Sequence, residues 1–140
     1  MSTSKKVLDS YALIAYFEDE PGAEQVKQLL IQAESGKTML LMSMVNWGEV
    51  YYILYRSKGE RIAEESKLVM DQLPITLVEA DKPLTYQAAR LKAKHAIAFG
   101  DCFAAALAMI HESQVVTGDP EFRRMESEVA VSWLGNPQNK

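Results

Sequence analysis

Four carboxylates of this chain, Asp9, Glu49, Asp101 and Asp119, stand where they could bind a metal ion. Asp9 and Asp119 each follow a short run of strand-forming residues, and ligands of parallel sheets bind beyond the carboxyl ends of strands. Asp101 begins an almost wholly apolar helix, so we expect its helix N-terminus to point into the protein, where the helix dipole favours a carboxylate. Asp is also a favoured N-cap residue, so ordinary capping is an open alternative for these three aspartates.

Glu49 lies in the middle of a predicted helix, where capping cannot explain it. A helical projection places it between Val45 and Ile53, and most of the remaining circumference is aromatic or aliphatic, so we expect a largely buried helix and little water around Glu49. A buried, ionised glutamate needs a partner. Asn46, one turn earlier, is one candidate, an arginine from another helix is a second, and a cation is the partner we favour.

The types of these residues indicate which cation that would be. Four carboxylates in one pocket would repel one another by roughly 4 kcal/mol per close pair at an effective dielectric constant of about 20, so their convergence requires positive charge. One cysteine, Cys102, and two histidines cannot form a Cys/His zinc cluster. Oxygen ligands alone select Mg²⁺ or Mn²⁺, and Mg²⁺ commonly binds substrate phosphates. The sequence therefore suggests phosphodiester chemistry.

The elements that must position these acids alternate between strand and helix patterns along the chain. Such alternation predicts parallel strands joined by right-handed crossovers, in a three-layer α/β/α sandwich of about five strands. We expect strands at 5–8, 38–44, 75–80, 114–117 and 129–134, and helices at 11–17, 23–35, 45–57, 60–73, 82–95, 102–111 and 121–125, followed by a frayed tail at 135–140.

Composition sets limits on the class of protein. The length of 140 residues and the 48% hydrophobic content predict one compact domain over residues 1–140. No apolar stretch approaches the roughly 20 residues of a membrane span, and no signal cleavage site follows the start, so we expect a cytoplasmic protein.

The net charge of −4 argues against long-range attraction to nucleic acid. Basic groups gather locally at 56–61, 90–94 and 123–124, which softens that objection. The alternative interpretation of these groups is that they are solvated helix faces.

Four segments occur in an order and at intervals that match a known family. They are VLDSYALIAYF at 7–17, NWGEVYYIL at 46–54, FGDCFAAALA at 99–108 and VVTGDPEF at 115–122. On these segments the chain resembles PIN-domain nucleases, and more narrowly the toxin ribonucleases of the VapC type, over nearly its whole length.

The resemblance implies a sheet with strand order 3-2-1-4-5, which places Asp9 beside the strand that ends before Asp119. It further implies that Asp9 and Asp101 are the principal metal ligands, and that Asp119 and Glu49 complete the acidic cluster directly or through water. Thr117 would belong with these four acids among the catalytic residues.

Thr117 and Ser10 occupy hydroxyl positions that similar proteins use to orient a carboxylate or a water molecule. A strand-end turn and a helix cap are their alternative roles. The activity implied is Mg²⁺- or Mn²⁺-dependent hydrolysis of RNA, in which a carboxylate helps to deprotonate the attacking water and the products carry a 5′-phosphate and a 3′-hydroxyl. The implied partners are an RNA substrate, a cognate antitoxin protein and a second copy of the chain in a homodimer.

Three other functions compete with this interpretation. A noncatalytic PIN-like module that binds RNA or protein would have no need of all four acids. A receiver-type phosphoacceptor domain expects an acidic pair near the first strand and a lysine after the last, whereas Asp9 has no acidic neighbour and Lys140 is the sole lysine after Trp133. A haloacid-dehalogenase-like phosphatase expects D-x-D, and this chain has Asp9-Ser10-Tyr11.

Overall fold

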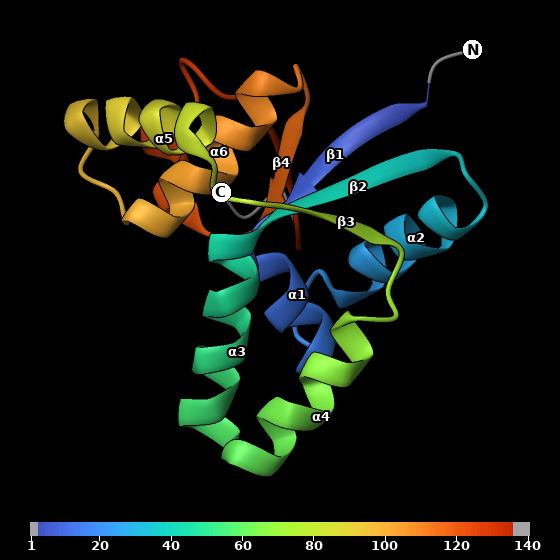
Figure 1. Cartoon of the computed structure of the whole chain (residues 1–140). Coiled ribbons are helices and arrows are strands. Elements are labelled where there is room, and N and C mark those ends of the chain that lie inside the picture. Colours follow the sequence, from blue (N-terminus) through green and yellow to red (C-terminus); the bar gives the residue numbers. More distant parts are fainter. Residues whose placement is uncertain (1–2, 136–140) are drawn as a thin grey trace.

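A computed structural model describes residues 3–135 as a five-stranded sheet with helices on both faces (Figure 1). The strands lie in the order β3-β2-β1-β4-β5, and every neighbouring pair is parallel, so the predicted α/β/α sandwich and strand order are confirmed. The strands are β1 (Ser4–Leu8), β2 (Thr38–Ser43), β3 (Ile75–Val78), β4 (Gln114–Thr117) and β5 (Val131–Trp133), and the helices are α1 (Ser10–Phe17), α2 (Ala23–Glu34), α3 (Met44–Lys58), α4 (Glu60–Met70), α5 (Lys82–Lys94), α6 (Phe99–Ile110) and the 3₁₀ helix η1 (Pro120–Met125).

The two faces of the sheet bury two separate hydrophobic clusters. Successive side chains of a strand point to opposite faces, and each of the three inner strands carries consecutive apolar residues, so both faces can be covered. These runs are Val7-Leu8 in β1, 39–42 in β2 and Val115-Val116 in β4. One cluster joins the sheet to α5, α6 and η1, and it includes Val7, Leu41, Val115, Phe103 and Phe122. The other joins the sheet to α1, α2, α3 and α4, and it includes Leu8, Leu40, Met42, Val116 and Val50.

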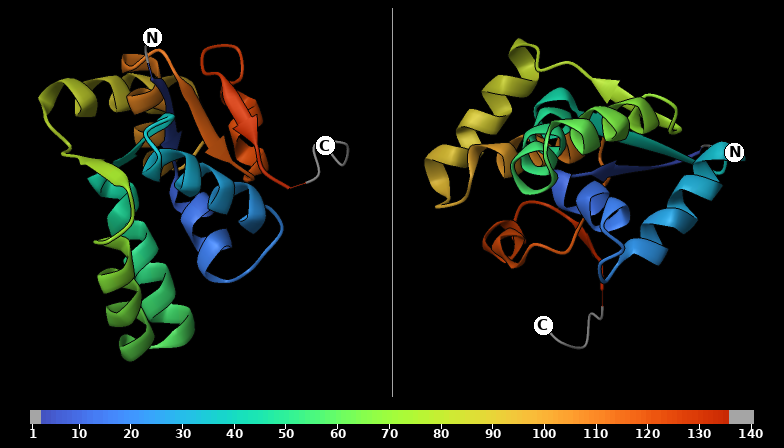
Figure 2. Two further views of the ribbon diagram at one scale, coloured as in Figure 1. Left: turned by 90° about the vertical axis from the view of Figure 1, so that its right-hand side faces the viewer. Right: turned by 90° about the horizontal axis from the view of Figure 1, so that it is seen from below.

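Helix α3 differs from its predicted environment. Val50 and Leu54 are buried, but Tyr52 and Tyr55 are 45% and 43% exposed, so the helix is not largely buried as its composition suggested. The reason is that α3 and α4 pack against each other and extend together beyond the sheet, as the left view of Figure 2 shows. Gly59, at φ +96°, joins them in a backbone conformation that suits glycine.

Helix α6 begins earlier than predicted. It starts at Phe99 with Ala98 as its N-cap, so Asp101 lies inside the first turn and does not cap the helix. The predicted tail at 135–140 falls almost wholly outside the described residues. Within residues 3–135, no helix is both long enough and apolar enough to cross a membrane.

Candidate active site

The carboxyl edge of the sheet carries the four acids that the sequence singles out. Asp9 directly follows β1, and Asp119 lies two residues beyond the end of β4. Asp101 is in the first turn of α6, which leads back to the start of β4 and therefore begins near the carboxyl edge. Glu49 projects from α3, which starts where β2 ends and packs against α6. Parallel strands thus bring together residues from four distant segments.

Asp9 is the most deeply buried of the four, with no exposed surface. Its Oδ1 accepts a hydrogen bond from the Ala12 N–H at 2.9 Å and so caps α1, whereas its buried Oδ2 has no hydrogen-bond partner within residues 3–135. Burial raises the pKa of Asp9 to about 8, although the Thr117 hydroxyl and the Ala12 amide lower it. The negative charges of Asp101 and Asp119 raise it further. Asp9 is therefore both a helix cap and a carboxylate that lacks compensating charge.

Thr117 connects Asp9 to Asp119. It is fully buried, and its hydroxyl oxygen accepts a hydrogen bond from the Asp119 N–H at 3.1 Å while the same hydroxyl lowers the pKa of Asp9. Asp119 caps η1, because its Oδ1 accepts from the Glu121 N–H at 2.9 Å. Capping and membership of the acidic cluster are thus compatible for Asp9 and Asp119.

Asp101 is electrostatically coupled to the other acids. Partial burial raises its pKa to about 7, and the negative charges of Asp119, Glu49 and Glu121 raise it further. Glu121 is a fifth acid that the sequence analysis missed. The signal was present in the segment VVTGDPEF, where Glu121 stands two residues after Asp119 on the short helix η1.

Glu49 is held by an amide and not by an arginine. The buried Asn46 Nδ2 donates to Glu49 Oε1 at 2.9 Å and to the backbone oxygen of Gly100 at 3.0 Å. The Glu49 carboxylate occupies the space beside Gly100 in which the Cβ of any other residue would stand. Of the partners considered from the sequence, Asn46 is present, and no arginine within residues 3–135 forms an ion pair with Glu49. Glu49 is only partly buried, so it faces more water than predicted.

The negative charge of this cluster is not neutralised by the described chain. Within residues 3–135, no Lys, Arg or His nitrogen lies within 4.0 Å of the carboxylates of Asp9, Glu49, Asp101 or Asp119. In the same range, no three His, Cys, Asp or Glu side chains stand close enough to hold one ion between them. The donor set still fits a hard cation, because all the groups are oxygens and the buried Asp9 Oδ2 has no partner. Mg²⁺ typically uses one or two carboxylates and keeps several waters.

Ser10, Cys102 and His95 are further polar residues that the structure describes. The Ser10 hydroxyl makes no side-chain hydrogen bond to the described part of the chain, and Asp9 caps the helix in its place. Burial raises the pKa of the Cys102 thiol to about 11, which keeps it neutral. His95 Nε2 pairs with Glu128 Oε2 at 2.6 Å.

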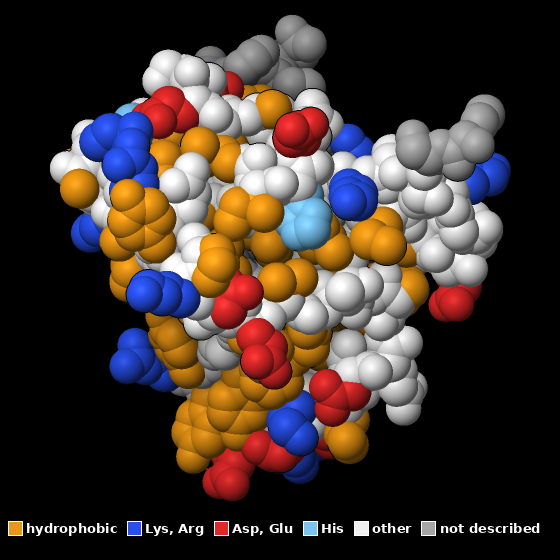
Figure 3. Space-filling model, turned by 45° about the horizontal axis from the view of Figure 1, so that its top comes forward, with side chains coloured by type: hydrophobic (Ala, Val, Ile, Leu, Met, Phe, Trp, Pro, Cys, Tyr) orange, Lys and Arg blue, Asp and Glu red, His pale blue; other side chains and the backbone are white. Residues whose placement is uncertain are grey.

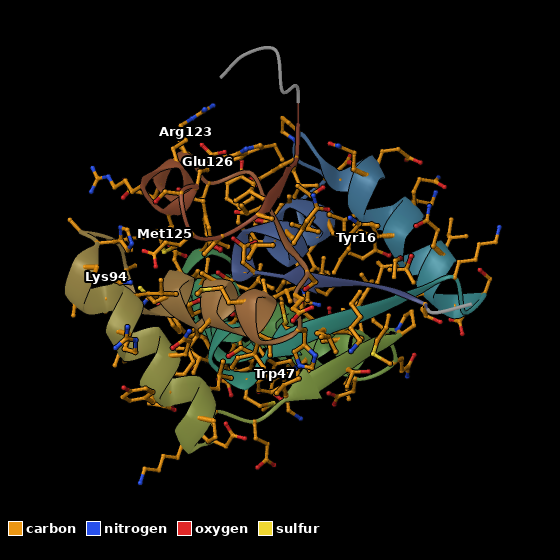
Figure 4. The ribbon with its side chains drawn as sticks, turned by 90° about the horizontal axis from the view of Figure 1, so that it is seen from above. Tyr16, Trp47, Lys94, Arg123, Met125 and Glu126 are labelled. Atoms are coloured by element: carbon orange, nitrogen blue, oxygen red, sulfur yellow. The ribbon has the colours of Figure 1, made fainter. Side chains whose placement is uncertain are left out.

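Glu128 also accepts from Lys94 Nζ at 2.7 Å, so it joins the end of α5 to the segment that follows η1. Figure 4 shows Lys94 on the same side of the molecule as Arg123 of η1 and Glu126, which follows η1. These contacts support the elements that carry Asp101 and Asp119 without touching either acid.

Comparisons with known proteins identify similar chains. The family model described as PIN domain matches residues 6–128. VapBC2 from Rickettsia felis, bound to a DNA fragment from its promoter, has a TM-score of 0.71 at 16% identity over 93% of this chain and 98% of that one. A toxin–antitoxin complex from Klebsiella pneumoniae has a TM-score of 0.63 at 16% identity over 91% and 95%.

A third similar structure is VapC20 of Mycobacterium tuberculosis, described as a sarcin-ricin loop cleaving toxin. Its TM-score is 0.70 at 16% identity, over 89% of this chain and 96% of that one. At these identities the likeness shows a shared fold. No curated protein matches the sequence.

Proposed function

The chain belongs to the PIN-domain family, and we propose that it is a metal-dependent endoribonuclease, the toxin of a toxin–antitoxin pair. The observation that carries the proposal is the uncompensated acidic cluster at the carboxyl edge of the sheet, where Asp9 is fully buried with one unpartnered oxygen. An unpaired buried charge costs several kcal/mol, so such a cluster persists in a protein when a ligand offsets it. RNA, in preference to DNA, is proposed on the family resemblance.

We assign Asp9 and Asp101 as the residues that would hold Mg²⁺ or Mn²⁺, with Asp119 and Glu49 acting directly or through water. When bound, the cation supplies positive charge against the carboxylates and the substrate phosphate, and it makes water a stronger nucleophile. This assignment is supported by the negative charges of Asp101 and Asp119, which raise the pKa of Asp9, and by that of Asp119, which raises the pKa of Asp101.

The remaining steps belong to the protein's own groups. Glu49 Oε1 is occupied by Asn46, and no described residue donates to Oε2, so Oε2 can accept a proton from the attacking water. We assign Thr117 a role in holding Asp9 and Asp119, because its hydroxyl accepts from the Asp119 N–H and lowers the pKa of Asp9. Cleavage by water would leave a 5′-phosphate and a 3′-hydroxyl.

The projecting pair of helices α3 and α4 offers a surface for the proposed antitoxin. Tyr52 and Tyr55 of α3 and Leu68 and Val69 of α4 are between 43% and 62% exposed. Hydrophobic side chains are visible on the lower part of the molecule in Figure 3, where these helices lie. Exposed apolar groups that gather in this way are typical of protein-binding surfaces. We therefore place the antitoxin contact on this helix pair.

A second apolar pair supports the proposed homodimer. Tyr86 of α5 and Phe99 of α6 are 63% and 44% exposed, and they lie on helices that pack against each other. We propose that these helices contribute to the dimer surface.

We also propose that the protein acts in the cytoplasm.

The nuclease proposal is tested by incubating purified, partner-free protein with structured and unstructured RNAs in Mg²⁺ or Mn²⁺, beside EDTA controls. The variants Asp9→Asn and Asp119→Asn each remove one negative charge while nearly keeping the shape of the side chain. We expect cleavage that needs the cation and is lost in both variants, with 5′-phosphate ends. Failure to cut any RNA, together with no effect of cations on melting, would leave a noncatalytic binding module.

A further inference from the structure

A buried amide bridges the two helices that carry Glu49 and Asp101. Asn46 has no exposed surface, and its Nδ2 reaches both Glu49 Oε1, at 2.9 Å, and the Gly100 backbone oxygen, at 3.0 Å. Both partners are acceptors, so they fix which end of the amide faces them. One side chain of α3 thus holds a carboxylate of its own helix and the peptide next to Asp101.

We propose that Asn46 is a positioning residue, whose amide holds the Glu49 carboxylate against the first turn of α6 and so sets the place of Glu49 relative to Asp101 in the cation site. This inference rests on the proposed function, and it assigns a role to a residue outside the acidic set. A neutral donor suits the task, because a lysine or arginine in its place would bring the positive charge that the cation has to supply.

The opposite side of the contact is shaped to receive Glu49. Gly100 leaves open the space that the Glu49 carboxylate fills, and a Cβ at this position would overlap Oε1, Oε2 and Cδ of Glu49. Gly100 lies inside a helix and its φ is not in the left-handed region, so backbone conformation does not require glycine here. Close approach of the carboxylate is the physical reason for glycine at this position.

The arrangement is not the one that folding alone would favour. With Nδ2 turned to its two acceptors, the buried Asn46 Oδ1 has no hydrogen-bond partner among the described residues. A buried carbonyl without a donor destabilises the folded state. Glycine is also a poor helix former compared with alanine. Residues that destabilise the fold locally, such as this unpaired amide oxygen and this glycine in a helix, are expected at functional sites.

The test measures Mn²⁺ affinity by titration calorimetry on RNA-free protein, so that it does not depend on activity. We expect Asn46→Ala to weaken Mn²⁺ binding by about 10–100-fold, as loss of an outer partner of a metal ligand does. Thr38→Ala is the matched control, because it also removes a side-chain hydrogen bond of a buried residue. Thr38 lies at the opposite edge of the sheet, where its hydroxyl donates to Gln32 Oε1. This variant should melt at a lower temperature and bind Mn²⁺ as the wild type does.

A double-mutant cycle shows whether Asn46 acts through Glu49. If it does, Asn46→Ala adds no further loss of Mn²⁺ affinity to a protein that already carries Glu49→Ala. Wild-type affinity in Asn46→Ala, or a full additional loss on the Glu49→Ala background, would overturn the inference.

Gly100→Ala perturbs the contact between Glu49 and α6 from the α6 side. It tests the same inference if Asn46→Ala does not fold. It should weaken Mn²⁺ binding, because the new Cβ displaces Glu49, and unchanged affinity would overturn the inference. Absence of Mn²⁺ binding by the wild type is a separate result. It would overturn the proposed cation site itself and with it the proposed function.

Discussion

Replacing Asp9 by asparagine removes a buried charge without removing a helix cap. The Asn side-chain oxygen can accept from the Ala12 N–H as Asp9 Oδ1 does, and the amide nitrogen replaces the unpartnered Oδ2. We expect Asp9→Asn to abolish cleavage and yet to stabilise the cation-free protein at alkaline pH.

The magnitude follows from the burial of Asp9. Its pKa rises from 3.8 to about 8, which corresponds to about 6 kcal/mol at 1.36 kcal/mol per pKa unit. The folded state keeps a proton that the unfolded state releases, so the free energy of unfolding falls as pH rises from about 4 to about 8. Water entry and local movement reduce this loss, and we take about 2 kcal/mol as the smallest difference consistent with the reasoning.

Thermal and urea unfolding in EDTA, at about pH 4.5 and about pH 8.5, measure the effect. Asp81→Asn is a matched control, because Asp81 caps α5 through the Leu84 N–H at 3.0 Å but is exposed. The stability gain of Asp9→Asn over the wild type should grow with pH, whereas Asp81→Asn should show no such growth. Cation at about 100 times its dissociation constant should then stabilise the wild type by roughly 2.7 kcal/mol and the variant by less.

Two results would contradict this prediction. A lower stability of Asp9→Asn than of the wild type at both pH values would mean that the Asp9 carboxylate is compensated in the folded state. Equal stabilisation of the wild type and the variant by cation would mean that Asp9 does not contribute to the site.

Three further outcomes follow from the same geometry. Mn²⁺ affinity should rise between about pH 6 and about pH 8.5, because Asp9 and Asp101 have raised pKa values and must lose protons before they bind a cation; calorimetry showing no change over this range would contradict it. Thr117→Val removes the acceptor for the Asp119 N–H and should raise the pKa of Asp9. We expect the free energy of unfolding in urea to fall by about 1–3 kcal/mol and cleavage to slow, and unchanged stability and rate would show that the hydroxyl is dispensable. Leu68→Asp should leave RNA cleavage intact and weaken antitoxin binding in a pull-down with the co-expressed partner; retained binding would place that partner elsewhere.

Local patterns were sufficient to predict the strands and the acids that follow them, whereas the strand order came from the family resemblance. The apolar run predicted at 38–44 forms β2 at 38–43, and the segment 114–117 forms β4, because both are rich in strand-forming residues. Asp9 and Asp119 could be placed because parallel strands end at a common edge. Their capping roles were foreseen as an alternative, and the structure shows capping and clustering together.

Long-range packing accounts for what the sequence did not reveal. The bond from Asn46 to Gly100 joins residues 54 positions apart, and no periodic pattern encodes such a pair. The apolar and aromatic residues around α3, Tyr52 and Tyr55 among them, led us to expect a buried helix. In the structure α3 extends beyond the sheet and packs against α4, which covers only one side of it, so both tyrosines are partly exposed. Capping by Asp101 was an open alternative, but α6 extends back to Phe99, which packs on Phe103 one turn later, so Asp101 lies inside the helix.

We propose above that the acidic cluster binds a divalent cation and uses it to cut RNA. The most direct measurement is a Mg²⁺ titration of cation-free protein, followed in parallel by single-turnover cleavage of a labelled RNA and by melting temperature. We expect both to rise from their cation-free values and to saturate at the same concentration, and both responses to be lost in Asp101→Asn. Cleavage that proceeds in EDTA, or a melting shift that saturates while every RNA in the panel stays intact, would contradict the claim.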